Sequence, residues 1–172
     1  MNPAAGGLHL RAFQSEDPPL LRAVFESAVH TVASRHYTPE QCAAWAPHDH
    51  DAAAWAERMV LLQPIVAEIG GEVVGFTSLQ PTGYIDMFFV AGPHVGRGVA
   101  TSMMARLYAT AQALKLDALF ANVSLTAESF FLKHGFAIEA RQAVERAGVM
   151  LRNARMRKVI RIAPSPTSRR DD

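Results

Sequence analysis

The sequence predicts a single α/β (α+β) domain in which a mostly antiparallel sheet is flanked by helices. Strand-like apolar runs and helix-like apolar spacings follow one another in the order β-α-α-α-β-β-β-α-β-α-β-β. Two glycines between two apolar runs predict a tight hairpin, so the first four strands are expected to be antiparallel neighbours. A chain of 172 residues suits one domain, which buries about 70% of its unfolded surface.

The first strand and helix are predicted near the N-terminus. Residues 8–13 alternate between apolar and polar side chains, as in a half-buried strand. Asp17 and Pro18 are typical of a helix start, with aspartate at the N-cap and proline in the first turn. The helix behind them presents one apolar face, made of Leu20, Leu21, Val24, Phe25, Ala28, Val29 and Val32.

A capping box predicts the start of a second, short helix. Thr38 is followed three residues later by Gln41, the spacing at which each side chain caps the other's backbone amide. This helix carries Cys42 and Trp45 and ends before the polar run 47–51.

A third helix and a hairpin follow. Residues 52–62 place Trp55, Met59 and Leu62 on one side of a helix. The hairpin consists of residues 64–69, the glycine pair at 70–71 and residues 72–79. Pro81, Thr82 and Gly83 then form a turn into the next strand.

The most informative stretch comprises a buried strand, a glycine-rich turn and a helix. Residues 84–90 contain one charge among seven residues, as in a strand covered on both faces. The turn at 91–98 holds three glycines, and the helix opens near Gly98. Its apolar residues recur at helical spacing at Val99, Met103, Met104 and Leu107.

The remaining elements alternate in type. Residues 116–123 predict a strand, and 126–134 predict a helix with Thr126 at the N-cap and Gly135 just past its end. Two final strands are predicted at 136–145 and 149–162. Flexible termini are expected at 1–7 and at 163–172, which is rich in proline, serine and charge, so the domain spans 8–162.

The glycine-rich turn favours a phosphate or pyrophosphate site. The first amides of a helix lack intrahelical partners, and the helix dipole adds roughly half a positive charge there. Small residues at Gly96, Gly98 and Ala100 would leave those amides uncovered, and Arg97 could add a cation. From the local pattern alone, a glycine turn that merely links strand to helix is an equal alternative. The P-loop signature is absent, and Thr101 stands where a dinucleotide fingerprint needs glycine.

Two motifs resemble those of the GNAT superfamily of acetyl-CoA-dependent acetyltransferases. The run from Val95 to Ala100 is similar to the family's Q/R-x-x-G-x-G/A loop, with Val95 in place of Gln or Arg. The run from Ser124 to Phe136 resembles N-x-x-A-x-x-x-Y-x-x-x-G-F. Here Ser124 replaces the Asn and Phe131 replaces the Tyr. The resemblance covers about residues 8–162.

The resemblance implies a GNAT-like mixed sheet that splays at its fourth strand. It implies that main-chain amides of Phe88, Phe89 and Val90 receive the pantetheine and the thioester carbonyl. The coenzyme-binding residues it implies are Phe88, Phe89, Val90, Val95, Gly96, Arg97, Gly98, Val99, Ala100, Thr101, Ser124 and Phe131. The implied activity is transfer of acetyl from acetyl-CoA to a primary amine.

Asp86 and two tyrosines are the candidate catalytic residues. Asp86 is the one carboxylate in the apolar central strand, where it could accept a proton from the incoming amine or be paired with a core Arg or His. Phe131 cannot donate the proton that the family's Tyr supplies. Tyr84, two residues before Asp86, and Tyr37, in a loop on the expected acceptor side, could replace it or serve only in packing. A thiolate could also leave unassisted, because the pKa of a thiol is about 8.5.

The run 47–51 contains histidines and aspartates at close spacing. A metal site there is possible in principle, but a solvated helix lead-in is favoured, so no metal is expected. With Arg35, His36, Tyr37 and Trp45 it could instead line the acceptor pocket. Trp45 and Trp55 are interpreted as core residues in preference to ligand contacts.

Composition narrows the class of protein. A net charge of +1 with 19% charged residues gives no reason to expect nucleic acid or membrane partners. The single cysteine, the lack of a signal-peptide pattern and the absence of a long apolar run indicate a cytoplasmic protein. We expect an N-acetyltransferase acting on a small-molecule or protein amine, by direct attack within a ternary complex, as a monomer or homodimer. The alternatives are a non-catalytic acyl-CoA-binding sensor or scaffold and, last, a nucleotide-binding protein.

Overall fold

The computed structural model describes residues 7–160. Residues 1–6 of the flexible segment expected at 1–7, the flexible segment expected at 163–172, and the end of the last predicted strand at 161–162 lie outside these residues. None of the helices described within 7–160 combines the length and apolar character needed to cross a bilayer.

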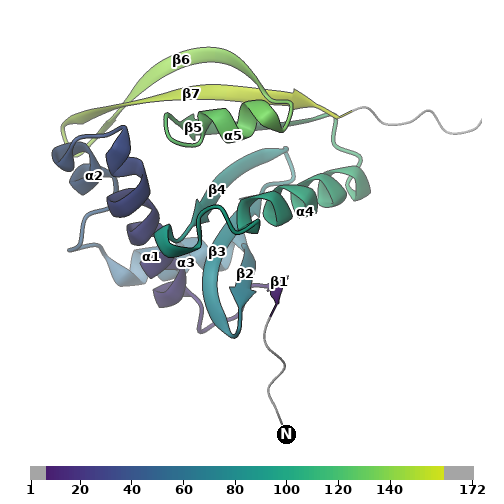
Figure 1. Ribbon diagram of the computed structural model, residues 1–172, viewed down its shortest axis with the longest axis horizontal. Coiled ribbons are helices and arrows are strands. Elements are labelled where there is room, and N and C mark those ends of the chain that lie inside the picture. The colour runs from purple at the N-terminus through teal and green to yellow at the C-terminus, as the bar shows by residue number, and fades with distance from the viewer. Residues whose placement is uncertain (1–6, 161–172) are drawn as a thin grey trace, which may run out of the picture.

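The described chain forms one seven-stranded sheet in the order β1-β2-β3-β4-β5-β7-β6 (Figure 1). The strands are β1 (Leu8–Ala12), β2 (Ile65–Ile69), β3 (Glu72–Leu79), β4 (Tyr84–Val90), β5 (Ala118–Ser124), β6 (Ala137–Arg146) and β7 (Val149–Val159). The helices are α1 (Pro18–Ser27), α2 (Pro39–Trp45), α3 (Ala52–Leu62), α4 (Val99–Ala113) and α5 (Glu128–Lys133), with a π-helical turn η1 (Ala28–Val32) and 3-10 turns η2 (Ala33–Arg35) and η3 (Gly92–His94).

The predicted antiparallel order of the first four strands is confirmed. β1 to β4 pair in sequence, each antiparallel to the next. Gly70 and Gly71 have φ angles of 61° and 84°, the left-handed conformation that a two-residue hairpin turn requires. β4 pairs in parallel with β5, which makes the sheet mixed, as the resemblance implied.

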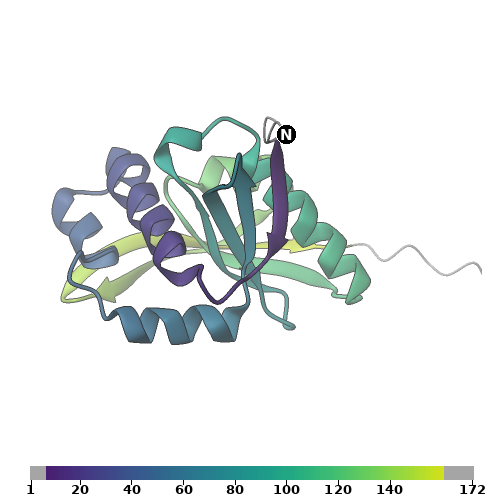
Figure 2. The ribbon, with the colours of Figure 1, turned by 90° about the horizontal axis from the view of Figure 1, so that it is seen from below.

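Helices cover both faces of the sheet (Figure 2). Side chains of α1, α2 and α3 pack with Val66, Phe76 and Met87 on one face. On the other face, Val99 and Met103 of α4 pack on the β2–β3 hairpin, and further residues of α4 and α5 pack on β5 and β7. The four apolar positions that defined the predicted helix after Gly98, among them Val99 and Leu107, are at most 1% exposed.

The predicted helix starts are confirmed at α1 and α2, with Asp17 at the N-cap of α1 and Pro18 in its first turn, but the two caps differ in their hydrogen bonds. Thr38 and Gln41 form the predicted capping box. Asp17 precedes α1 as predicted, but its carboxylate does not cap the helix. It instead accepts hydrogen bonds from both terminal nitrogens of Arg11, each at 2.7 Å, and from the amide of Gln14. A charged partner on β1 is a stronger donor than a neutral backbone amide.

Two further details differ from the sequence prediction. Thr126 does not cap α5, which begins at Glu128; its hydroxyl lies 3.1 Å from Nδ1 of His36. Leu20, assigned to the apolar face of α1, is 49% exposed. Gly135 follows the end of α5 with φ +84°, as predicted.

Candidate active site

The site lies where β4 and β5 separate. Their parallel pairing is limited to Tyr84 with Phe120 and Ile85 with Ala121, at the start of β4. Beyond Ile85 the two strands diverge, and Figure 1 shows the gap between the ribbons of β4 and β5. The predicted splay at the fourth strand is therefore present.

A β-bulge in β4 adjoins the point of divergence. Thr77 opposes Phe88 and Leu79 opposes Ile85, so β4 has one residue more than β3 between these pairs. The hydroxyl of Thr77 donates to the Met87 carbonyl at 2.7 Å, and the hydroxyl of Ser78 accepts from the Met87 amide at 3.1 Å. These two buried hydroxyls satisfy the backbone groups that the bulge removes from regular pairing.

The bulge decides which side chains of β4 face which layer. Ile85 and Phe88 contact the α4 side of the sheet although they are three residues apart, and Val90 joins them. Met87 and Phe89 contact the α1 side. In a regular strand, residues three apart point to opposite faces.

Two main-chain amides of β4 face the gap. The amide of Ala91 donates to the carbonyl of Val74 at 2.9 Å, so alternate residues 89 and 91 are the ones bonded to β3. The amides of Phe88 and Val90 therefore point away from β3, toward the space left by β5. The amide of Phe89, assigned a binding role by the resemblance, is directed toward β3.

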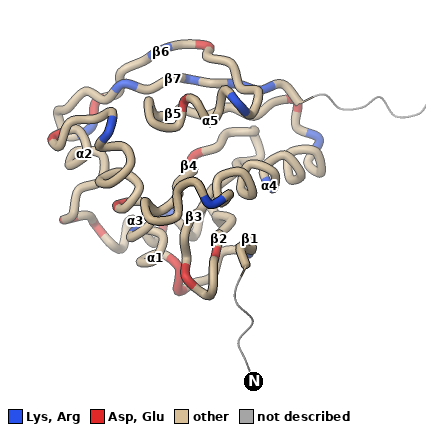
Figure 3. The backbone as a smooth tube through the Cα atoms, in the orientation of Figure 1, with Lys and Arg blue, Asp and Glu red and all other residues tan. Residues whose placement is uncertain are grey.

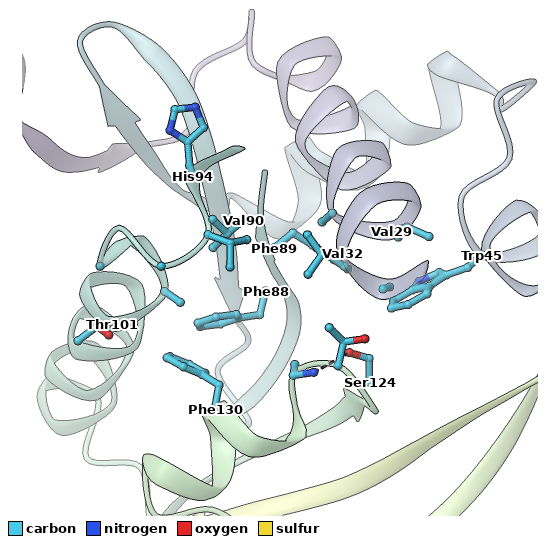
Figure 4. A pocket seen from close by; sticks show the side chains of 18 residues that line it. Val29, Val32, Trp45, Phe88, Phe89, Val90, His94, Thr101, Ser124 and Phe130 are labelled. Carbon is cyan, nitrogen blue, oxygen red and sulfur yellow. Dashed lines mark hydrogen bonds between the residues drawn. The ribbon is translucent and has the colours of Figure 1, made fainter. Parts of the chain in front are cut away.

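An apolar cavity of about 520 Å³ lies between the diverging strands β4 and β5. Its walls come from η1, β4, the glycine-rich loop and the segment before α5. The lining residues are Ala28, Val29, Val32, Ala33, Trp45, Phe88, Phe89, Val90, His94, Val95, Gly96, Gly98, Ala100, Thr101, Ser124, Thr126, Ala127 and Phe130. Figure 4 shows Phe88 and Phe130 side by side, with Trp45 and Ser124 toward the other end.

The glycine-rich loop presents unused amides to this cavity. Within residues 7–160, no atom accepts a hydrogen bond from the backbone amides of Gly96 through Thr101; the first helical bond of α4 is from Ser102 to Gly98. Gly98 is the N-cap with φ +81°, and an added Cβ there would meet nothing within 4 Å. The loop thus offers an open cradle of N–H groups at a helix N-terminus, which suits an anionic phosphate.

The loop is anchored from behind by α1 and η1. The amide of Gly92 donates to the hydroxyl of Ser27 at 2.9 Å. A Cβ at Gly92 would lie 2.1 Å from the hydroxyl of Thr31, so only glycine fits this contact. Arg97 is exposed, and its Nη1 lies 3.4 Å from Nδ1 of His94.

A second, polar cavity of about 400 Å³ lies on the α1–α3 side of β4. It is lined by Arg22, Phe25, Tyr37, Ala44, Trp45, Trp55, Arg58, Tyr84, Asp86, Met87, Phe89, Asn122, Ser124, Val144, Arg146, Leu151, Arg152 and Asn153. The two cavities share Trp45, Phe89 and Ser124. A group that enters one cavity can therefore meet a group that enters the other at these three side chains.

Asp86 and Tyr84 both line the polar cavity. The carboxylate of Asp86 accepts a hydrogen bond from Nη2 of Arg58 at 3.0 Å. Tyr84 accepts a hydrogen bond from Nδ2 of Asn122 at 3.3 Å, and no residue of the described range accepts its hydroxyl proton. Burial raises the pKa of Tyr84 above its ordinary value, and the charge of Asp86 adds to this, so the phenol remains protonated at neutral pH.

Tyr37 has a different environment. Its side chain is buried, its hydroxyl donates to the carbonyl of Arg152, and the same oxygen accepts from the amide of Leu125 at 3.0 Å. Its one proton is committed to β7, so Tyr37 links the end of β5 to β7 and is not a free donor.

The two candidate residues of the second motif are separated by the fold. Phe131 is 2% exposed and packs against Phe88 and Phe136; it is not among the cavity-lining residues. Its neighbour Phe130 faces the apolar cavity instead. Ser124 lies at the junction, where its hydroxyl accepts from the amide of Ala127 at 3.2 Å and its proton has no acceptor within the described chain.

The histidine-rich segment lies away from both cavities. His48 and His50 approach Glu26 at 3.8 and 3.7 Å, and His48 stacks on His30 with ring centroids 4.6 Å apart. Across residues 7–160, no three His, Cys, Asp or Glu side chains are grouped to hold a metal ion. Of the four residues expected to lie with this segment at an acceptor pocket, Tyr37 and Trp45 line the polar cavity, whereas Arg35 and His36 line neither cavity.

Sequence reasoning did not identify Arg58, Asn122, Arg146 and Asn153, which line the polar cavity. In the sequence, each of them is only a polar side chain within a strand or helix pattern. Nothing local shows that they converge, because this depends on how distant strands pair. Trp45 and Trp55 were interpreted as core, and both also line the polar cavity.

Comparison with known proteins agrees with this architecture. The family model described as an acetyltransferase (GNAT) domain matches residues 33–159. The chain is 37% identical over 150 residues to the uncharacterized N-acetyltransferase YafP of Escherichia coli (strain K12), covering 87% of this chain and 95% of that protein. A crystal structure of a GCN5-related N-acetyltransferase from Rhodopseudomonas palustris is similar with a TM-score of 0.84 and 31% identity, over 93% of this chain and 99% of that one.

A more distant structure shares the fold. The PaiA N-acetyltransferase from Thermoplasma acidophilum, solved in complex with coenzyme A, has a TM-score of 0.72 at 13% identity, over 90% of this chain and 99% of that one. With a family model that spans most of the chain and a relative that matches nearly all of it, the chain belongs to the GNAT family and is an N-acetyltransferase.

Proposed function

We propose that residues 8–162 form one acyltransferase domain that transfers acetyl from acetyl-CoA to a primary amine, of a small molecule or a protein, within a ternary complex. The observation that carries this proposal is the meeting of the apolar and polar cavities at Trp45, Phe89 and Ser124. Two ligands can occupy the two cavities at once and touch there, as direct transfer requires.

The apolar cavity and the glycine loop fit the coenzyme. The free amides from Gly96 to Thr101 would hold the diphosphate, with Arg97 adding a positive charge and with Val95, Val99 and Ala100 positioning the loop. The amides of Phe88 and Val90 would bond to the pantetheine arm and the thioester oxygen. The bound coenzyme supplies an activated acetyl group as a thioester.

Asp86 and Tyr84 are proposed to act on the amine. A protonated amine has no free electron pair, so it must lose a proton before attack. Asp86, directly or through water, would accept that proton, and Tyr84 would orient the nitrogen. The nitrogen forms a bond to the carbonyl carbon, the carbon–sulfur bond breaks, and the sulfur leaves with the electron pair.

Ser124 is proposed to assist the departing sulfur. It lines both cavities, and its hydroxyl proton has no acceptor among residues 7–160. Phe131 occupies the family's tyrosine position, is buried, and has no proton to give. A hydrogen bond from Ser124 would stabilise the developing thiolate.

A covalent acetyl-cysteine route is disfavoured. Cys42, the one cysteine of the chain, is 2% exposed and lines neither cavity. Its thiol points at the carbonyl of Val29 at 3.7 Å, and burial raises the pKa of Cys42.

The proposal is tested by calorimetry of acetyl-CoA binding and by thiol release from acetyl-CoA with a panel of amines. Direct transfer predicts intersecting lines in double-reciprocal plots and full activity in Cys42→Ala. Parallel lines with an inactive Cys42→Ala variant would instead indicate an acetyl-cysteine. Binding of acetyl-CoA without thiol release for any amine would favour a non-catalytic acyl-CoA-binding module.

A further inference from the structure

The polar cavity carries more positive than negative side chains. Asp86 is the one carboxylate among its lining residues, against four arginines. Figure 3 shows that Lys and Arg recur along β7, the strand between β5 and the edge strand β6, which contributes residues to this cavity.

Two of the arginines are already neutralised. Arg22 donates to Glu26 at 2.7 Å and to the carbonyl of Pro47, and its guanidinium lies over the rings of Phe25 and Trp55 at 5.1 and 5.3 Å. Arg58 is paired with Asp86. Neither has its charge available to a ligand without giving up a partner.

Arg146 is the available cation. It ends β6, next to the Ala147–Gly148 turn, and is exposed at the cavity. No carboxylate of residues 7–160 lies within 4.0 Å of its guanidinium. The positive charge of Arg146 acts on the cavity: burial raises the pKa of Tyr84, and the charge of Arg146 partly offsets this rise. Arg152, the fourth lining arginine, also has no carboxylate within 4.0 Å among residues 7–160. By strand alternation, however, its side chain starts from the face of β7 opposite to that of Leu151 and Asn153, so Arg146 is the better placed of the two.

Asn153 supplies an unpaired acceptor at the other end. Its Oδ1 is buried and has no hydrogen-bond partner within the described chain. Asn153 lines the polar cavity, and in the β5–β7 register it lies opposite Ser124, which lines both cavities. A buried carbonyl oxygen without a donor is costly, and a ligand N–H placed there would satisfy it.

Resting on the proposed function, we propose that the acceptor is an amine that also carries an anionic group, a carboxylate or a phosphate. Its nitrogen would lie at the junction beside Asn153 and Ser124, and its anion would bind Arg146 at the end of β6. A guanidinium binds a carboxylate or phosphate through paired N–H groups, so the contact selects for this charge and geometry. Cationic acceptors such as polyamines are disfavoured by the same residue.

The test compares ω-amino acids of two to six carbons with their neutral amides, which differ only in charge at the far end. Aminoalkylphosphonates of the same lengths distinguish phosphate from carboxylate recognition, and diamines represent cationic acceptors. For at least one length, the acid or the phosphonate is expected to exceed the amide in kcat/KM by about tenfold or more, which corresponds to about 1.4 kcal/mol. Diamines are expected to be the poorest acceptors.

The variants Arg146→Gln and Arg146→Glu are then assayed with the same series. Arg146→Gln is expected to abolish the preference for acids, and Arg146→Glu to shift it toward diamines, while the affinity for acetyl-CoA is unchanged. Arg157→Gln is the matched control, because Arg157 lies on β7 outside both cavities, 3.9 Å from Glu139. It should retain the wild-type preference.

The outcomes separate this inference from the proposed function. Equal use of acids and amides at every length, or an unchanged preference in Arg146→Gln, overturns the inference and leaves the transferase intact. If no amine releases thiol from acetyl-CoA, the proposed function fails. The preference for an anionic ligand is then tested by measuring the binding of acids and amides to the polar cavity. The fluorescence of Trp45 and Trp55, which line the polar cavity, should respond to acids at concentrations about tenfold lower than to amides; equal or absent responses overturn it.

Discussion

Nη2 of Arg58, on α3, lies 3.0 Å from Oδ2 of Asp86, on β4, across the polar cavity. Their side chains are 51% and 17% exposed, so the pair is open to solvent on the arginine side. The guanidinium of Arg58 thereby fixes the position of the Asp86 side chain at the polar cavity, and breaking the pair costs little, because exposed ion pairs contribute little stability.

Asp86→Asn is expected to lower kcat by about 100-fold, a typical loss for a general base. The affinity for acetyl-CoA should not change, because Asp86 does not line the apolar cavity. Arg58→Gln is the control, since it breaks the same ion pair and retains the carboxylate; it should keep most of the activity. Steady-state kinetics over pH, with calorimetry for the coenzyme, measure both effects. Unchanged kcat in Asp86→Asn at every pH would exclude Asp86 as the base.

Ser124→Ala is expected to reduce kcat by about tenfold, through loss of one hydrogen bond to a charged sulfur. Thr126→Val serves as a control, because Thr126 lines only the apolar cavity. A thioester with a more acidic thiol needs less assistance, so the deficit of Ser124→Ala should shrink with such a donor. An equal deficit with both donors would mean that Ser124 acts by positioning alone.

Gly98→Ala is expected to weaken acetyl-CoA binding by about tenfold and to destabilise the fold by about 1–2 kcal/mol, because alanine is strained at φ +81°. Gly148→Ala is a close match, with φ +77° and equally open surroundings in the β6–β7 turn. It should show similar destabilisation and normal coenzyme affinity. Thermal melts of both variants measure the destabilisation by backbone strain, and calorimetry measures the affinity for acetyl-CoA. Equal acetyl-CoA affinities of Gly98→Ala and Gly148→Ala would contradict the role proposed for the loop.

Tyr37→Phe is expected to destabilise the protein by about 1–3 kcal/mol with little change in kcat, because it leaves the Arg152 carbonyl and the Leu125 amide unpaired. The pH dependence gives a second readout. Burial raises the pKa of Tyr37 above its ordinary value of 10, so the unfolded chain loses this proton first. The wild-type unfolding free energy therefore falls as pH rises above about 10, and the fall should be smaller in Tyr37→Phe. A large loss of kcat without loss of stability would restore Tyr37 as a catalytic candidate.

Local signals in the sequence predicted most of the fold. The Gly70–Gly71 hairpin, the Thr38–Gln41 capping box and the strand before Gly98 depend on neighbours within a few residues, and all three are present. Asp17 occupies the N-cap of α1 without capping it through its side chain, and Thr126 is not the N-cap of α5. Each side chain instead has a partner on another element, Arg11 for Asp17 and His36 for Thr126. A polar side chain binds the strongest donor or acceptor that the tertiary structure brings to it, and local spacing does not reveal that donor.

The candidate site likewise has one part that depends on local sequence and one part that depends on the tertiary structure. The open amides of the glycine-rich loop could be predicted because they depend on small residues in one short segment. The lining of the polar cavity could not, because Arg58, Asn122, Arg146 and Asn153 converge from α3, β5, β6 and β7. Their convergence follows from strand register and from the divergence of β4 and β5, which are set by the whole sheet.

The extra residue in β4 has a consequence for anyone who compares or edits this strand. The bulge absorbs this residue, so that Phe88 and Val90 face α4 and Phe89 faces α1. If β4 kept all seven residues but paired without the bulge, strict alternation from Ile85 would turn Phe89 toward α4, and Phe88 and Val90 toward α1. An alignment that ignores the extra residue would assign side chains of the α4 face to the α1 face, so the position of the bulge must be matched before any residue of β4 is equated with one in a relative.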